Sequence, residues 1–180
     1  MPPADIPLLI YALMLHGLIG GLDVFVNHAL LARLPRQPWA APEQRMHSAR
    51  EALFCAIFIS LAWFEWHGAA VWWLALLYLG EVLVTARDVV VEGDTRVLPK
   101  PERMLHLFLF MNLGALLVLV GQAVLGWHVL PDAVVPTDYG WASWVLSTMG
   151  IGALVWAIRD GLVGWAHRAH DTAHPTDQKL

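Results

Sequence analysis

The chain has 180 residues, of which 58% are hydrophobic and 14% are charged, and its formal net charge is -4 at pH 7. Soluble domains carry about 25% charged residues, so this composition predicts a polytopic membrane protein instead. The single cysteine, Cys55, excludes an internal disulfide and a metal cage built from thiolates. No basic, aromatic-rich surface segment favours a nucleic-acid partner.

Five apolar segments approach the roughly 20 residues that a helix needs to cross about 30 Å of hydrocarbon. In chain order they are residues 6–31, 47–66, 69–86, 105–127 and 141–158. The amino terminus lacks the basic region and cleavage site of a signal peptide, so we expect the first segment to remain as a span. We therefore expect an all-α fold, a polytopic membrane helical bundle of about five transmembrane helices. It forms a single transmembrane domain, residues 1–166, followed by a polar cytoplasmic tail, residues 167–180.

Basic residues gather at one end of the predicted spans. They bracket the first and third loops and occur in the tail, and none lies at the amino terminus or in the second or fourth loop. Cytoplasmic loops are enriched in Lys and Arg, so the amino terminus is expected outside and the carboxyl terminus in the cytoplasm. Tryptophans gather at the opposite end, as an aromatic belt would. We expect an integral protein of a bacterial inner membrane.

A short pattern occurs twice, each time at the start of an apolar segment. It is PEQRMH at residues 42–47 and PERMLH at residues 101–106. An acid inside the preceding span, Asp23 or Glu81, stands at a similar distance before each copy. We interpret the pattern as a duplicated helical hairpin, in which spans one and two are echoed by spans three and four. Chance similarity is the alternative, because little else in the two segments matches.

Folding the hairpins back brings ionisable residues to one depth near the cytoplasmic face. Asp23 and Glu81 approach the ends of descending helices, and His47 and His106 begin ascending ones. At about 1.5 Å per residue they lie within roughly 12 Å of the inner face. Ionisable groups inside a membrane are costly, usually face the bundle interior and indicate a functional site. The candidate metal ligands are Asp23, His47, Glu51, Glu81, Glu102 and His106, with His16, His28, Glu43 and Asp88 as a second tier.

This inventory resembles that of the diiron-carboxylate four-helix proteins, in which two helices each give one acid and the other two each give a Glu and a His one turn away. Carried over to this chain, the resemblance makes Asp23 and Glu81 the single acids, with Glu51 or Glu43 beside His47 and Glu102 beside His106. The spacing here is Glu-x-x-x-His and His-x-x-x-Glu, where that family has Glu-x-x-His. The chain also resembles the membrane-bound fatty-acid desaturases and hydroxylases, which have a cytoplasm-facing dimetal site among transmembrane helices, but it lacks their histidine-rich boxes.

The resemblance implies a membrane oxidoreductase with a cytoplasm-facing dimetal centre. Two ions are expected, first of all iron, with manganese or zinc also suited to imidazole and carboxylate ligands. The reaction would hydroxylate, desaturate or otherwise oxidise a lipid or isoprenoid-like substrate. An external electron donor is required, because the sequence shows no flavin or nicotinamide site.

Two other classes of function stay open from the sequence. One is a transporter whose polar layer passes a cation or proton, a class commonly built from repeats. The other is a membrane electron carrier in which His47 and His106 hold a haem b as axial ligands. The oligomeric state is open as well, since the chain is compatible with a homo-oligomer and with one subunit of a membrane complex.

Several polar residues also have a structural interpretation. Glu43 and Glu102 each follow a proline at a predicted helix start, where an acid favours the helix dipole. Arginines at the cytoplasmic ends of the spans, Arg50 among them, offer ion-pair partners to the acids. His16 lies deeper in its span, where a hydrogen-bonded interior histidine is the commonest case. The three histidines between residues 167 and 174 are expected in a solvated end of the chain.

Overall fold

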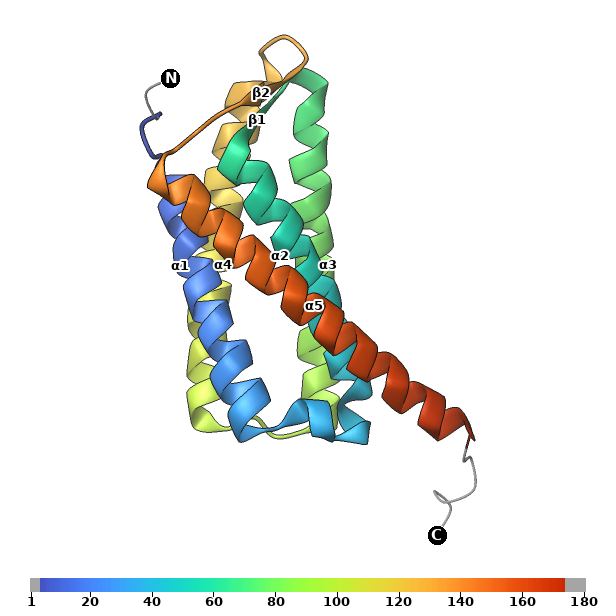
Figure 1. Cartoon of the computed structure of the whole chain (residues 1–180). Helices are drawn as coiled ribbons and strands as arrows, with labels where there is room; N and C mark the ends of the chain where they lie inside the picture. Colours follow the sequence, from blue (N-terminus) through green and yellow to red (C-terminus); the bar gives the residue numbers. More distant parts are fainter. Residues whose placement is uncertain (1–3, 174–180) are drawn as a thin grey trace.

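The structure is a computed structural model that describes residues 4–173, with side chains as far as His167. The described chain is helical apart from one small sheet, as Figure 1 shows, so the all-α fold class is confirmed. The long helices are α1 (Leu8–Leu22), α2 (Ala41–Trp63), α3 (Val71–Thr95), α4 (Lys100–His128) and α5 (Trp141–Ala173). α1 continues directly as a π-helix, η1 (Asp23–Leu31), and the short 3-10 turns η2 (Leu34–Arg36) and η3 (Pro38–Ala40) lead into α2.

Four helical stretches are long and apolar enough to cross a membrane. They are Leu8–Leu31, Gly68–Thr95, Lys100–His128 and Trp141–His167. Their outward faces carry large exposed apolar side chains, for example Leu76, Leu125 and Leu154. A continuous apolar surface of this kind is unfavourable in water, whereas in a bilayer it contacts lipid tails. The structure is therefore consistent with an integral membrane protein.

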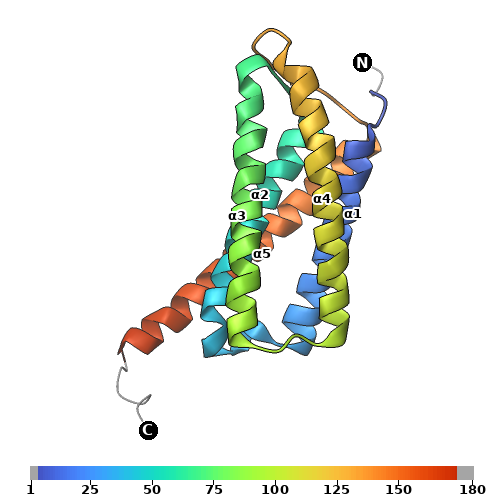
Figure 2. The ribbon, with the colours of Figure 1, turned by 180° about the vertical axis from the view of Figure 1, so that it is seen from behind.

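The helices pack as a four-helix bundle with the fifth helix laid across it. α1 lies beside α4, α2 lies beside α3, and α5 crosses the bundle obliquely, mainly against α2 (Figure 1 and Figure 2). The core between them is built from fully buried aliphatic side chains, including Leu13, Ile57, Leu74 and Leu146. α2 packs against both α3 and α5, so two of its faces are covered by other helices.

A two-stranded antiparallel sheet closes the end of the bundle at which the amino terminus lies (Figure 1). Strand β1 (Phe64–His67) follows α2, and strand β2 (Ala133–Pro136) lies between α4 and α5. The turn after β1 is held by the Asp132 carboxylate, which accepts a hydrogen bond of 2.7 Å from the Ala69 amide. Gly68, at φ +58°, lies against Asp132, so this position needs a residue without a side chain. The sequence does not predict this sheet. It assigns residues 64–66 to the second span, residues 47–66, and leaves the segment of β2 in the loop before the fifth span, because the paired segments are short and far apart in the chain.

The helices extend beyond the predicted apolar segments at the end of the bundle opposite the sheet. α2 begins at Ala41 rather than at residue 47, α3 ends at Thr95 rather than at 86, and α4 begins at Lys100 rather than at 105. α5 continues to Ala173, past the predicted end of its span at 158, and residues 174–180 of the predicted tail lie outside the described residues. A prediction from hydropathy ends a segment at the first charged residues, whereas in the structure the charged turns next to the apolar segments are still helical. The extra turns carry four of the five buried acids described next, Glu43, Asp88, Glu92 and Glu102.

Candidate metal centre

A cluster of buried acids and histidines lies where η1, the end of α3 and the starts of α2 and α4 meet. Its acids are almost inaccessible: Asp23 and Glu43 are 0% exposed, Glu102 is 1% exposed, and Asp88 and Glu92 are 3% exposed. Its histidines are His28, His47 and His106. Buried carboxylates are retained only where hydrogen bonds, opposite charges or metal ions compensate their lost hydration. The partners of these acids therefore decide what the cluster can do.

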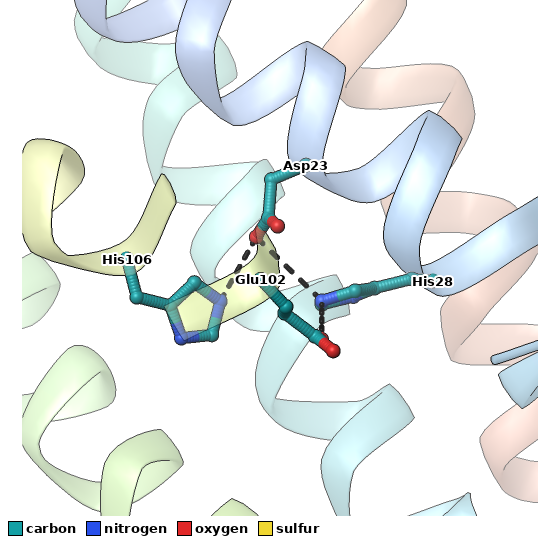
Figure 3. A group of neighbouring side chains, drawn as sticks. All are labelled: Asp23, His28, Glu102 and His106. Atoms are coloured by element: carbon teal, nitrogen blue, oxygen red, sulfur yellow. Dashed lines mark hydrogen bonds and ion pairs between the residues drawn. The ribbon is translucent and has the colours of Figure 1, made fainter. Parts of the chain in front are cut away.

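The first candidate group comprises Asp23, His28, Glu102 and His106, each of which offers one ligand atom within 4.8 Å of the others. Figure 3 shows these four side chains converging from η1 and α4. Asp23 Oδ2 lies 3.0 Å from His106 Nε2 and 3.6 Å from His28 Nε2, and Glu102 Oε1 lies 2.9 Å from His28 Nε2. Two ligand atoms about 2.1 Å from a shared metal, at angles of about 90–110°, are roughly 3.0–3.4 Å apart. The spacing thus suits a four-ligand metal site as well as a set of hydrogen bonds.

The π-helix explains how two residues of one segment reach this group. In an α-helix, residues five apart point about 140° away from each other, since each residue turns the helix by about 100°. In η1 the bonding runs from i to i+5, as in the 2.8 Å bond from the Ala32 amide to the Asn27 carbonyl. Asp23 and His28 therefore face the same side. Asn27 Nδ2 donates a hydrogen bond of 2.7 Å to Asp23 Oδ1, which leaves Oδ2 for the two histidines.

The second candidate group comprises His28, Glu43 and His47, again with one ligand atom each within 4.8 Å of the others. The Nδ1 atoms of His28 and His47 are 3.0 Å apart, and the two rings are stacked with centroids separated by 4.3 Å. His28 therefore turns Nε2 towards the first group and Nδ1 towards the second. One imidazole connects the two groups, and both of its nitrogens lie at a distance typical of neighbouring metal ligands.

Arg96, in the short link between α3 and α4, binds three of the buried acids. Its guanidinium donates hydrogen bonds to both oxygens of Glu43 and of Glu102 and to Oε1 of Glu92, the last at 2.9 Å. Burial alone would lower the pKa of the Arg96 guanidinium, but hydrogen bonds to Glu102 and Glu43 raise the pKa above its ordinary value. Arg96 is therefore a permanent cation on the loop side of both groups.

A second arginine lies on the other side of His47. Arg50 Nη1 donates a hydrogen bond of 3.0 Å to Asp88 Oδ2, and the same oxygen is 3.5 Å from His47 Nε2. Asp88 thus orients the His47 ring, so that Nδ1 faces His28. Carboxylates that hold the second nitrogen of a metal-binding imidazole are a common feature of metal sites.

The charges of the cluster do not balance among the described side chains. Its five buried acids exceed the two guanidinium groups, those of Arg96 and Arg50, by three. An uncompensated charge in such surroundings is strongly unfavourable. The excess must be balanced by protons on the histidines and carboxyl groups or by metal cations. The first possibility describes a structural network, and the second describes a metal centre.

The cluster contains part of each set of residues singled out in the sequence. From the first tier it unites Asp23, Glu102 and His106 in one group and places His47 in the other. From the second tier it adds His28 and Glu43 to the groups. Asp88 lies next to them, on His47. His28, which the sequence ranks low, is the residue that the two groups share.

Glu51, Glu81 and His16 lie outside both groups. Glu81 Oε1 accepts a hydrogen bond of 2.8 Å from Thr85, and Glu51 lines a separate cavity. The His16 ring stacks on Phe54 at 4.6 Å and its Nδ1 lies 3.2 Å from Asn112 Nδ2, as expected for an interior histidine. None of the three is placed to share an ion with the histidines of the cluster.

Arg96 is the important residue that the sequence did not single out. From the sequence it is only one of the basic residues that indicate a cytoplasmic loop. The signal that could have found it is Glu92, four residues earlier at the end of α3, followed closely by Glu102 after the link.

Comparisons with protein-family models, with curated proteins and with solved structures found no match to this chain. The function is therefore inferred from the geometry of the chain itself.

Proposed function

We propose that this chain is an integral membrane metalloenzyme whose buried cluster binds two metal ions, one in each candidate group. The observation that supports the proposal is the position of His28, which turns one ring nitrogen towards each group. To bind both ions His28 would give up its ring proton, and two dications would then balance the three excess carboxylates together with the imidazolate. In this arrangement Asp23, Glu102 and His106 complete the first site, and Glu43 and His47 complete the second.

The ligand chemistry favours iron, with manganese or zinc as alternatives, because imidazole and carboxylate suit all three. With iron the centre would supply oxidising chemistry, and we infer an oxidoreductase that hydroxylates, desaturates or otherwise oxidises a lipid-like molecule from the bilayer. Such a reaction needs an external electron donor. The chain's own residues would hold the ions, keep the centre dry and place basic groups at the cytoplasmic face.

We propose five membrane spans, which are the four apolar stretches described above and, in addition, α2. α2 has 23 residues, enough to cross the roughly 20-residue thickness of the hydrocarbon, and its lower hydropathy is explained by its two acids and two arginines, Glu43, Glu51, Arg45 and Arg50. The amino terminus and the β1–β2 sheet lie at one end of the bundle, and the cluster lies at the other. We propose that the cluster faces the cytoplasm and the amino terminus lies outside, in a bacterial inner membrane; the basic loops at the cluster's end of the bundle support this orientation.

We further propose that the hairpins α1–α2 and α3–α4 are a duplication. Each histidine of the repeated pattern contacts an acid of the other hairpin: His47 lies 3.5 Å from Asp88, and His106 lies 3.0 Å from Asp23. The glutamates of the two copies, Glu43 and Glu102, both bind Arg96. Reciprocal contacts of this kind are expected between two copies of one ancestral unit packed face to face.

The other functions open from the sequence find less support. A haem held by His47 and His106 would need a flat space between them, but the His28 ring stacks on His47 and lies 6.3 Å from the centroid of His106. No observation favours transport over catalysis. A metal-free ion-pair network is the alternative against which the proposal must be tested.

The test is the metal content of the protein, purified in detergent after growth with ample iron. We expect about two ions per chain in the wild type, about one in His47→Ala and in His106→Ala, and almost none in His28→Ala. His67→Ala is the matched control, since His67 contacts Glu65 at the opposite end of the bundle. Less than about one ion per wild-type chain would refute the metal centre. Full occupancy in His28→Ala would refute the shared ligand.

The oxidoreductase part needs its own measurement. Iron-loaded protein in lipid nanodiscs, supplied with a chemical reductant, is expected to consume oxygen and to oxidise a lipid component. The zinc-loaded protein serves as the control, because zinc binds the same ligands without redox chemistry. Equal oxygen consumption by both forms would exclude the proposed reaction while leaving the metal sites in place.

A further inference from the structure

A cavity of about 350 Å³ lies between α1, α2 and α5, beside the cluster, with which it shares Arg50. This volume is within the range of small-molecule sites, which is about 300–1,000 Å³. Most of its wall is apolar, from residues such as Val24, Phe54, Leu109 and Met149. Its few polar side chains are those of Arg50 and Glu51 on α2 and of His16 on α1. Arg50 contacts Asp88 next to the candidate metal centre, and Glu51 follows Arg50 in the chain.

Glycines create the space and leave it open towards the outside of the bundle. Gly21 and Gly152 line the cavity, and a methyl group built on either one would meet no atom within 4 Å. Both are exposed on outward faces of their helices, as is Phe25, which is 51% exposed. In a membrane protein, such an opening faces the lipid tails. A molecule can therefore enter the cavity sideways from the bilayer.

Two of the residues that line the cavity carry buried polar atoms that lack partners among the described residues. Both carboxylate oxygens of Glu51 are buried without a hydrogen bond, and so is Nε1 of Trp156. Arg50, the nearest basic residue in the chain, already donates to Asp88. Leaving such groups unpaired away from water is unfavourable by about 1–3 kcal/mol for each group. A ligand that binds here should satisfy a buried acceptor and a buried donor together.

We propose that this cavity binds a lipid with a single long chain and a hydroxyl head group. A hydroxyl both donates and accepts, so it can donate to Glu51 and accept from Trp156 Nε1. The chain would lie along Gly21 and Gly152 towards the bilayer. The role of this lipid as the substrate of the metal centre rests on the proposed function. The binding of the lipid to the cavity does not.

The binding test uses a long-chain primary alcohol that carries a diazirine, added to the purified full-length protein in nanodiscs and photolysed. We expect labelling of the α1 and α5 segments that line the cavity, mapped by mass spectrometry. Hexadecanol should compete with the probe. Its methyl ether, which accepts but cannot donate a hydrogen bond, should compete about tenfold less well. Labelling spread evenly over the lipid-facing helices, or equal competition by alcohol and ether, would overturn the proposal.

Two substitutions sharpen the test. Gly152→Leu fills the cavity and should abolish the labelling, and Glu51→Leu removes the acceptor and should weaken the probe about tenfold. Gly114→Leu on α4 is the matched control, because Gly114 is equally open but does not line the cavity. Gly21→Leu replaces Gly152→Leu if the latter is not monodisperse. Wild-type labelling in both cavity-filling variants would refute the site.

The metal content of the same samples separates this proposal from the previous one. Specific labelling of a chain that binds no metal would leave the lipid site standing and remove the metalloenzyme. A metal-loaded chain without specific labelling would remove only the lipid site. Loss of labelling in Gly152→Leu with unchanged metal content is the result that supports both.

Discussion

Replacing Arg96 by methionine is expected to destabilise the protein strongly. The Arg96 side chain is 11% exposed and donates to Glu43, Glu92 and Glu102, which are almost completely buried. Removing one partner of a buried ion pair costs about 3–5 kcal/mol, because the remaining charge is left uncompensated. Here three carboxylates lose a partner, so we expect a value near 5 kcal/mol, a large share of the roughly 5–15 kcal/mol of a typical native state.

The assay is unfolding in mixed micelles with an increasing fraction of sodium dodecyl sulfate, followed by tryptophan fluorescence in the presence of a chelator. Arg96→Lys is the control for charge, since lysine keeps the cation but cannot bind three carboxylates with a planar fork. It should lie between the wild type and Arg96→Met. Adding Glu92→Gln to Arg96→Met removes one unpaired anion and should restore about 1–2 kcal/mol. A change below about 1 kcal/mol in Arg96→Met would show that the acids are balanced by other means and would refute the reasoning.

Two further changes test other parts of the structure. Glu81→Gln should leave the metal content unchanged, because Glu81 bonds to Thr85 and belongs to neither candidate group; loss of one ion on elemental analysis would restore its predicted role as a ligand. Gly68→Ala should lower the free energy of unfolding by more than about 1–2 kcal/mol, the cost of a left-handed backbone for a residue with a Cβ atom. The new methyl would also lie against the Asp132 side chain and backbone; an unchanged unfolding midpoint in the same micelle assay would contradict this.

The helices were predictable because the bilayer imposes a simple rule on the sequence. Each apolar segment corresponds to a long helix, and the clean segment at residues 105–127 lies within α4 (Lys100–His128). The depth of the polar layer was predictable for the same reason. A descending and an ascending helix must bring their loop-side residues to one end of the bundle, so Asp23, Glu102 and His106 meet.

The composition of the candidate groups was less accessible to sequence reasoning. Helical spacing of 3.6 residues per turn puts Asp23 and His28 on different sides, and nothing local in the segment announces the π-helix that aligns them. The predicted repeat also treats Asp23 and Glu81 as equivalent, whereas their surroundings in the structure differ. Glu81 lies further from the loops than His47 and His106 do. At that depth it accepts a hydrogen bond from Thr85. The acid that takes the corresponding place beside His47 is Asp88.

The fifth helix has a different relation to the cluster from the other four. In the described part of α5 no residue belongs to either candidate group, whereas Met149, Gly152, Ala153 and Trp156 all line the cavity. α5 is held to α2 by close packing and by bonds such as the 2.7 Å hydrogen bond from Ser48 Oγ to the Ala157 carbonyl. The hairpins α1–α2 and α3–α4 by themselves would enclose the cluster and leave the Glu51 face of α2 uncovered. Addition of α5 covers that face and, through its glycine and alanine, leaves room for a chain-like molecule beside the buried acids.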